Sequence, residues 1–242
     1  MADLVLYKRV LLKVSGEALL GGQENALDST RLSAIAEQIA QAHKAGYELG
    51  VVIGGGNICR GGVFAAHAGE RAQADQMGML ATTINALALR HALVNAAVPC
   101  VVLSALFMPN ICELFSQNKA LEALTAGKVV IFAGGTGNPF FTTDSAAALR
   151  AAEIKADVIL KATQVDGVYS ADPKKDSSAV RFDRLNYQEV LVRGLAVMDM
   201  AAIAIAQENK IPVLVYSLHN SGALLKVLRG EGVFTLITTR KI

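Results

Sequence analysis

Short, uninterrupted apolar runs alternate along the chain with longer stretches whose apolar residues recur at helical spacing. The runs predict strands at 10–14, 49–53, 99–103, 129–133, 158–161, 212–216 and 234–238. The stretches predict helices between the cap at 28–30 and the stop at Gly46, and at 72–97, 117–126, 145–154, 199–208 and 223–228. Strands without polar alternation are typical of a parallel sheet buried on both faces. We therefore expect an α/β fold, a three-layer αβα sandwich with a mostly parallel central sheet.

Composition narrows the class of protein. No linker, repeat or low-complexity segment divides the 242 residues, so we expect one domain with two lobes over residues 1–242. A hydrophobic share of 52% and a charged share of 18% exclude disorder. The net charge is +2 and the basic residues do not cluster, since Lys174-Lys175 is followed at once by Asp176. This pattern gives no sign of a nucleic-acid partner.

Cysteine and histidine spacing gives no metal or haem motif. The cysteines Cys59, Cys100 and Cys112 are odd in number and form no C-x-x-C pair, and the four histidines are scattered. Charges within 1–14 argue against a signal peptide. Asp199 interrupts the best apolar candidate, Leu195–Ala206, so we expect no membrane span. A cytoplasmic protein is the expectation.

Three glycine loops follow predicted strands. Ser15-Gly16 follows the first strand, Gly54–Gly56 the second and Gly134–Gly137 the fourth. The carboxyl ends of parallel strands meet at one edge of the sheet, where ligands bind. Backbone N–H groups converging there suit several phosphates. The alternative is that these glycines only make tight turns.

Lys13 lies within the first apolar run, immediately before the first glycine loop. An ammonium buried there needs a partner, which is either a salt bridge or an anionic ligand. Two common phosphate motifs are excluded, because the chain has no G-x-x-x-x-G-K-[ST] and no G-x-G-x-x-G after its first strand.

Five stretches, in order and over nearly the whole chain, resemble bacterial UMP kinases. They are Lys13–Leu19 (KVSGEAL), Gly54–Asn57 with Arg60-Gly61, Asp75–Thr82 (DQMGMLAT), Gly135–Asp144 (GTGNPFFTTD) and Lys161–Pro173 (KATQVDGVYSADP). The lysine and the glycine loops are shared with the wider amino-acid kinase superfamily. The Asp75–Thr82 and Gly135–Asp144 stretches are far more specific to UMP kinases.

The resemblance implies transfer of the γ-phosphoryl group of ATP to the phosphate of UMP. The acceptor needs no general base, because a phosphomonoester with a second pKa of about 6 is already an anion near pH 7. The chemistry requires neutralised charge and aligned substrates. Mg²⁺ enters with ATP and is expected to be held mainly by the nucleotide phosphates, with no protein metal site.

By the same resemblance, four residues form the reaction centre. Lys13 would contact the donor phosphates, Arg60 would bridge the phosphates of both substrates, and Asp199 would orient Lys13. Asp144 would lie near Lys13 and the metal. Its alternative is a helix cap, and the two roles are compatible. A solvated loop arginine is the alternative for Arg60.

The resemblance also divides the chain between the two substrates, with UMP mainly in the N-terminal part and ATP mainly in the C-terminal part. Asp75 would bind the UMP ribose, unless it is only a helix-start carboxylate, and 136–143 would form the wall for uracil and phosphate. The expected UMP-binding residues are Gly55, Asp75, Thr136, Gly137, Asn138, Pro139, Phe140, Phe141, Thr142 and Thr143. The expected ATP-binding residues are Lys13, Val14, Ser15, Gly16, Gly56, Arg60, Thr163, Tyr169 and Asp172.

The long apolar helical pattern over 72–97 offers interface surface beyond what the core needs, and closed symmetric assembly is common. The finer expectations on assembly and regulation come from the resemblance. It implies a homohexamer, with GTP as activator and UTP as inhibitor, but Gly21–Ala26 and Phe107–Lys119 carry no distinctive signature for that regulation. Two other functions stay open at this point. One is a related kinase that acts on a carboxylate or carbamate, such as acetylglutamate kinase or the catalytic half of an aspartokinase. The other is a non-catalytic nucleotide-binding or storage protein.

Overall fold

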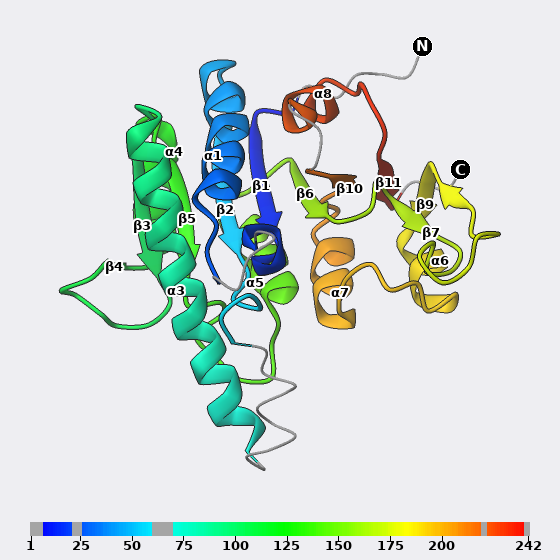
Figure 1. Ribbon diagram of the computed structural model, residues 1–242, viewed down its shortest axis with the longest axis horizontal. Helices are drawn as coiled ribbons and strands as arrows, with labels where there is room; N and C mark the ends of the chain where they lie inside the picture. The colour runs from blue at the N-terminus through cyan, green and yellow to red at the C-terminus, as the bar shows by residue number, and fades with distance from the viewer. Residues whose placement is uncertain (1–6, 21–25, 60–69, 219–221, 240–242) are drawn as a thin grey trace.

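A nine-stranded, mostly parallel sheet forms the middle layer of the molecule (Figure 1). The computed structural model describes residues 7–20, 26–59, 70–218 and 222–239. In chain order the strands of this sheet are β1 (Arg9–Val14), β2 (Glu48–Ile53), β3 (Cys100–Ser104), β4 (Glu113–Leu114), β5 (Val129–Ala133), β6 (Val158–Thr163), β9 (Arg184–Asn186), β10 (Val213–Ser217) and β11 (Thr235–Thr238). Their order across the sheet is β4-β3-β5-β2-β1-β6-β10-β11-β9. Only the β10–β11 pairing among these described strands is antiparallel, which confirms the predicted fold class.

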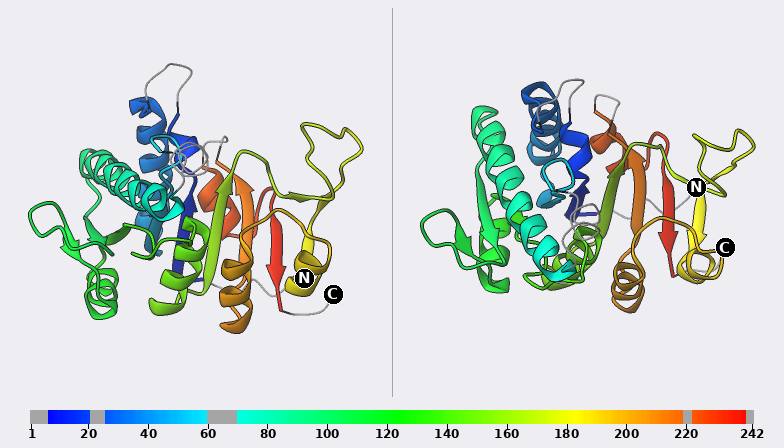
Figure 2. Two further views of the ribbon diagram at one scale, coloured as in Figure 1. Left: turned by 90° about the horizontal axis from the view of Figure 1, so that it is seen from below. Right: turned by 60° about the horizontal axis from the view of Figure 1, so that its bottom comes forward.

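Helices cover both faces of the sheet (Figure 2). They are the 3₁₀ turn η1 (Gly16–Leu19), α1 (Ser29–Lys44), α3 (Arg71–Asn95), α4 (Gln117–Thr125), α5 (Thr143–Glu153), α6 (Tyr187–Val192), α7 (Met200–Glu208) and α8 (Ala223–Leu228). One core lies between the sheet and α1, α3 and α8, and the other between the sheet and α4, α5 and α7. The result is the expected three-layer sandwich.

The alternation of side chains along β1 decides which layer each residue meets. Val10, Leu12 and Val14 belong to the core under α1 and α3, whereas Leu11 belongs to the core under α5 and α7. Because strand side chains alternate between faces, Lys13 shares the face of Leu11. The only lysine of this strand therefore points toward the α5 layer.

Short elements in two segments were not predicted. They are β4, the small two-stranded sheet of β7 (Val168–Tyr169) and β8 (Arg181–Phe182), β9, and α6. Elements of two or three residues are too short to show a hydrophobic period. The six residues of α6 are fixed by a capping box, in which Asn186 accepts from the N–H of Glu189 and Glu189 accepts from the N–H of Asn186.

Helix α3 corrects the expectation that Leu195–Ala206 is the most apolar candidate for a membrane span. Within the described residues, α3 is the helix that is long and apolar enough to cross a membrane by length and composition. Half of its apolar window is buried inside the molecule, against β3, β5 and α1. Such burial is typical of a core helix in a globular fold.

Candidate active site

Two cavities open beside the carboxyl ends of the central strands. The first, of about 610 Å³, lies among the loop after β2, the N-terminal half of α3 and the loop between β5 and α5. The second, of about 580 Å³, lies among the end of β1, β6 and the turns that follow it, and the 193–197 segment. Each cavity is in the size range of small-molecule sites. Two substrates could therefore approach the same sheet edge from two sides.

A charged cluster lies where the two cavities approach each other. Lys13 and Lys161 are register partners on β1 and β6, and both line the second cavity. Asp144, which follows the first cavity's Thr143, is paired with both of them: its Oδ1 is 2.8 Å from Lys13 Nζ and its Oδ2 is 2.6 Å from Lys161 Nζ. The salt bridge expected as one explanation of Lys13 is therefore present, and it does not remove Lys13 from the cavity.

The cluster shifts the pKa values of Asp144 and Lys161. Burial disfavours the charged form of Asp144, but Lys13 and Lys161 outweigh burial and hold the pKa of this carboxyl below its ordinary value. Burial lowers the pKa of Lys161 and Lys13 lowers it further, against the opposing effect of Asp144. Asp144 is therefore a carboxylate in the folded protein and not a proton donor.

Lys161 is the main residue that the sequence prediction missed. Lys161 begins one of the stretches that resemble UMP kinases, but the resemblance as stated assigns it no role. The sequence does point to Lys161, because a lysine within the apolar run of β6 needs a charged partner or an anionic ligand, as Lys13 in β1 does. Its Nζ also donates to the carbonyl of Val197, so it ties β6 to the segment before α7.

The alternative of Asp144 as a helix cap is corrected by the structure. The N-cap of α5 is Thr142, whose hydroxyl accepts from the N–H of Asp144 at 3.0 Å. Asp144 lies in the first turn, where a negative charge is favoured by the helix dipole. The side chain of Asp144 is thus free of capping and faces the two lysines.

Asp199 holds the start of α5. It caps α7 by accepting from the N–H of Ala202 at 2.7 Å, and it accepts from the hydroxyls of Ser145, at 2.8 Å, and of Thr142. Within the described part of the chain, these contacts do not include Lys13. Asp199 therefore positions the start of α5, which carries Asp144, and its charge also acts to raise the pKa of Lys161. The expected role of orienting Lys13 stays a prediction.

The loop before α5 forms one wall of the first cavity. Thr136, Asn138, Phe141, Thr142 and Thr143 line it, together with the expected Gly55 and Asp75. Gly56, expected on the ATP side, also lines this cavity.

Three expected UMP-binding residues are not among its lining residues: Gly137, Pro139 and Phe140. Positive φ angles at Gly134, Gly135 and Gly137 shape the loop, and a Cβ on Gly137 would lie 3.3 Å from that of Ala105.

Asp75 connects α3 to this wall. Its Oδ2 accepts from the N–H of Phe140 at 2.8 Å and lies 3.6 Å from Nε of Arg71. Asp75 is beyond the first turn of α3, which begins at Arg71. It is therefore not a helix-start carboxylate, and its side chain serves the cavity.

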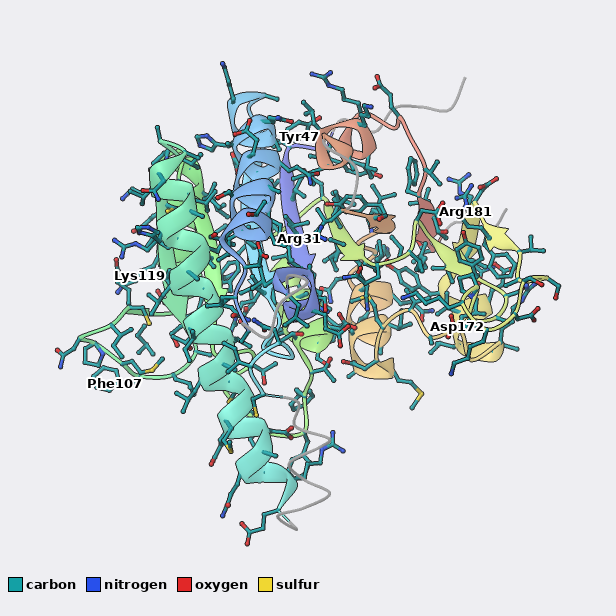
Figure 3. The ribbon with its side chains drawn as sticks, in the orientation of Figure 1. Arg31, Tyr47, Phe107, Lys119, Asp172 and Arg181 are labelled. Atoms are coloured by element: carbon teal, nitrogen blue, oxygen red, sulfur yellow. The ribbon has the colours of Figure 1, made fainter. Side chains whose placement is uncertain are left out.

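The expected adenosine residues all line the second cavity. Thr163 bonds within its own turn to Val165, Tyr169 donates to Asp166 at 2.7 Å, and Asp172 accepts from the N–H of Lys174 at 3.0 Å. The bond to Asp166 is the main reason that the pKa of Tyr169 is raised. Figure 3 labels Asp172, which belongs to the yellow segment between β7 and β8.

Close contact joins the first two glycine loops. A Cβ on Gly16 would lie 2.6 Å from Asn57 Oδ1 and 2.7 Å from the carbonyl oxygen of Gly54, so only glycine fits there. Ser15 lines the second cavity, whereas Val14 is buried and lines neither. Arg60 and most of the 21–26 loop lie outside the described residues.

The described ranges hold no protein cluster of metal ligands. No three His, Cys, Asp or Glu side chains gather there in a way that could hold a metal ion. Both oxygens of Asp144 are engaged by lysines. This donor set fits a cation that arrives on phosphates rather than one held by a protein cage.

The chain is similar to known proteins over most of its length. Residues 8–217 match the amino acid kinase family. The chain is similar to a uridylate kinase of Brucella anthropi, with 62% identity over 232 residues that span 96% of this chain and 97% of that protein. A uridylate kinase of Rhizobium meliloti is 59% identical over 233 residues, with the same coverage of 96% and 97%. The crystal structure of UMP kinase from Bacillus anthracis matches with a TM-score of 0.94 at 39% identity over 97% of each chain. That of UMP kinase from Ureaplasma parvum matches with a TM-score of 0.91 at 38% identity over 96% of this chain and 99% of that one.

Proposed function

This chain belongs to the amino acid kinase family and, within it, to the uridylate kinases, and on that premise we propose that it transfers the γ-phosphoryl group of ATP to UMP, giving UDP and ADP. The observation that carries the proposal is the Lys13–Asp144–Lys161 cluster between two cavities of nucleotide size. UMP occupies the first cavity and ATP the second. The N-terminal part of the domain is then mainly the UMP side and the C-terminal part mainly the ATP side.

Charge stabilisation is the main task of the cluster. Lys13 and Lys161 line the ATP cavity, so their ammonium groups meet the transferring phosphoryl group and its neighbours. Asp144 remains ionised between them and fixes both ammonium positions. Mg²⁺ bound to ATP supplies further neutralisation of phosphate charge. Arg60, by resemblance, bridges the phosphates of both substrates.

Recognition of UMP belongs to the first cavity. Asp75 binds the ribose, and the backbone and hydroxyl groups at Thr136, Asn138 and Thr143 meet the base and the phosphate. A site built to bond the uracil edge rejects other bases, because unpaired polar groups would be left buried. Thr163, Tyr169 and Asp172 lie on the adenosine side of ATP.

The assay that tests this function measures ADP release with ATP and each of UMP, CMP, AMP, GMP and N-acetylglutamate. We expect UMP to be strongly preferred. Comparable kcat/KM values for CMP and UMP would overturn the assignment of the base site. Turnover of N-acetylglutamate instead would place the chain with the carboxylate kinases, and no turnover of any acceptor would indicate a nucleotide-binding protein without catalysis.

We also propose a cytoplasmic homohexamer. Large apolar side chains are exposed along α3, namely Met77, Leu80, Ile84 and Val94, and offer interface surface beyond what the core uses. Light scattering that returned a monomer of 25.4 kDa at micromolar concentration would contradict an oligomer. GTP activation and UTP inhibition complete the proposal and are tested by ATP saturation curves with and without each nucleotide.

A further inference from the structure

Asn85 is a fully buried polar residue in the middle of α3 that lines neither cavity. Its Nδ2 donates to the carbonyl oxygen of Gly54 at 2.6 Å and to Oδ1 of Asn57 at 2.7 Å. Its Oδ1 accepts from Nδ2 of Asn57 at 3.1 Å. The second hydrogen of Asn57 Nδ2 goes to the carbonyl of Ala26 at 2.7 Å. All four amide hydrogens of this asparagine pair are therefore used.

The pair fixes the loop that follows β2. Because the peptide group is planar and trans, anchoring the carbonyl of Gly54 on Asn85 directs the N–H of Gly55 to the opposite side. Gly55 and Gly56 line the UMP cavity. The Asn57 side chain in turn packs against Gly16, since a Cβ there would lie 2.6 Å from Asn57 Oδ1. One buried amide thus sets the position of a loop that lines the UMP cavity and packs against Gly16.

Two other residues of α3 hold the remaining walls of the UMP cavity. Thr82 accepts from the N–H of Gly134 at 2.9 Å, and Asp75 accepts from the N–H of Phe140 at 2.8 Å. Thr82 and Asn85 are three residues apart and Asp75 and Thr82 seven, so the three side chains share one face of the helix. Helix α3 therefore holds three loop segments around the cavity from one side.

We propose that Asn85 is a positioning residue for phosphoryl transfer, which sets the Gly54–Asn57 loop and with it Gly55 and Gly56, the residues of this loop that line the UMP cavity. The inference rests on the proposed function. Reacting groups displaced by about 1 Å can cost about a hundredfold in rate even when the changed residue is remote. A small shift of this loop is therefore expected to appear in UMP kinetics before it appears in the fold.

Gln38 provides a matched control. It is also a buried amide, and it bonds backbone groups at both ends: its Nε2 donates to the carbonyl of Leu218 at 3.2 Å, and its Oε1 accepts from the N–H of Leu224 at 3.2 Å. These bonds join α1 to the region of α8 and do not involve the Gly54–Asn57 loop. A purely structural loss of a buried amide is therefore reproduced by Gln38→Ala.

The experiment compares wild type, Asn85→Ala, Asn57→Ala, the double variant and Gln38→Ala. Asn85→Ala is expected to lower kcat/KM for UMP by about tenfold or more, mainly through KM for UMP, while KM for ATP changes by less than about twofold. Asn57→Ala breaks the same amide pair at its partly exposed member. This variant replaces Asn85→Ala in the comparison if Asn85→Ala does not fold. Because both changes break one amide pair, the double variant is expected to lose much less than the product of the two single losses.

Hydrogen exchange gives a readout that does not need turnover. The amides of residues 54–59 are expected to exchange faster in Asn85→Ala than in wild type, and unchanged in Gln38→Ala. Wild type that makes no UDP would refute the proposed function, while this exchange comparison still decides the role of Asn85. The inference is overturned by kcat/KM for UMP within twofold of wild type in folded Asn85→Ala, by unchanged exchange in 54–59, or by an equal kinetic loss in Gln38→Ala.

Discussion

Lys13→Met tests whether the lysine acts on the transition state or only completes a salt bridge. Lys13 is buried, its Nζ lies 2.8 Å from Asp144, and it lines the second cavity, which we propose for ATP. Methionine keeps the length of the side chain and removes its charge. If the ammonium meets charge that develops during transfer, kcat falls by roughly a hundredfold or more, which corresponds to about 2.7 kcal/mol of lost transition-state stabilisation.

The cost in stability is expected to be smaller than for a simple buried ion pair. Removing one partner of such a pair typically costs about 3–5 kcal/mol, because the other charge is left buried without compensation. Asp144 keeps Lys161 at 2.6 Å after the change, so we expect the loss to fall below that range. The folded state should therefore persist at assay temperature, and the kinetic loss is then not a folding loss.

The assay measures kcat and both KM values by ADP release, together with the melting temperature and the oligomer size. Lys8→Met is the control, since Lys8 lies just before the other end of β1 and pairs with Glu48 at 3.3 Å on the surface. Lys13→Arg should not rescue fully, because a planar guanidinium cannot take the place of a compact ammonium. If folded Lys13→Met keeps kcat within threefold of wild type, Lys13 is a structural charge and the mechanism is wrong.

Three further changes probe the same site and its supporting core. Asp144 has a pKa in the folded protein below its ordinary value of 3.8, so the stability that it contributes is present above pH 3.8 and is lost as the pH falls toward the folded pKa. Asp144→Asn should therefore flatten this part of an acid unfolding profile. An unchanged profile would contradict the pairing of Asp144 with the two lysines. Tyr216 is fully buried and its hydroxyl has no hydrogen-bond partner within the described residues. Tyr216→Phe should therefore raise the free energy of unfolding by about 1 kcal/mol and the melting temperature by about 2–4 °C. A melting temperature below that of wild type would show that the hydroxyl has a partner. Gly16→Ala places a Cβ 2.6 Å from Asn57 Oδ1 and 2.8 Å from the nitrogen of Gly56. The value of kcat/KM should therefore fall by about tenfold or more. Full activity would show that the loops after β1 and β2 can move apart without cost.

The sheet was predictable because its central strands are buried on both faces. Their runs show no polar alternation, so β1, β2 and β5 stand out from the chain, and β5 has the predicted bounds of Val129–Ala133. The elements around β7–β9 and α6 were not predictable by the same reasoning. They are two to six residues long, partly exposed, and specified by capping and turn contacts instead of a period.

The site was predictable where a residue conflicts with its surroundings. A lysine in an apolar strand signals a function, and Lys161 carries the same signal as Lys13. The cap of α5 was not predictable, because Thr142, Thr143, Asp144 and Ser145 are all capping residues in a row. A tertiary contact decides among them, because the hydroxyl of Thr142 donates a hydrogen bond to Asp199, the N-cap residue of α7. Asn85 gave no signal, because α3 carries several polar residues, Asn95 among them, and only the folded structure shows which of them is buried.

The arrangement of charge explains how Asp144 can take part in the proposed reaction without being a base. Lys13 and Lys161 are register partners on neighbouring parallel strands, and neighbouring strands lie about 4.8 Å apart. Two ammonium groups held so close repel each other, so they could not both face one cavity without a negative charge between them. Asp144 supplies that charge, and two ammonium groups with one carboxylate leave one net positive charge at the point where phosphates meet. A phosphate acceptor that is already ionised requires this excess positive charge and a fixed geometry, and it requires no group that removes a proton.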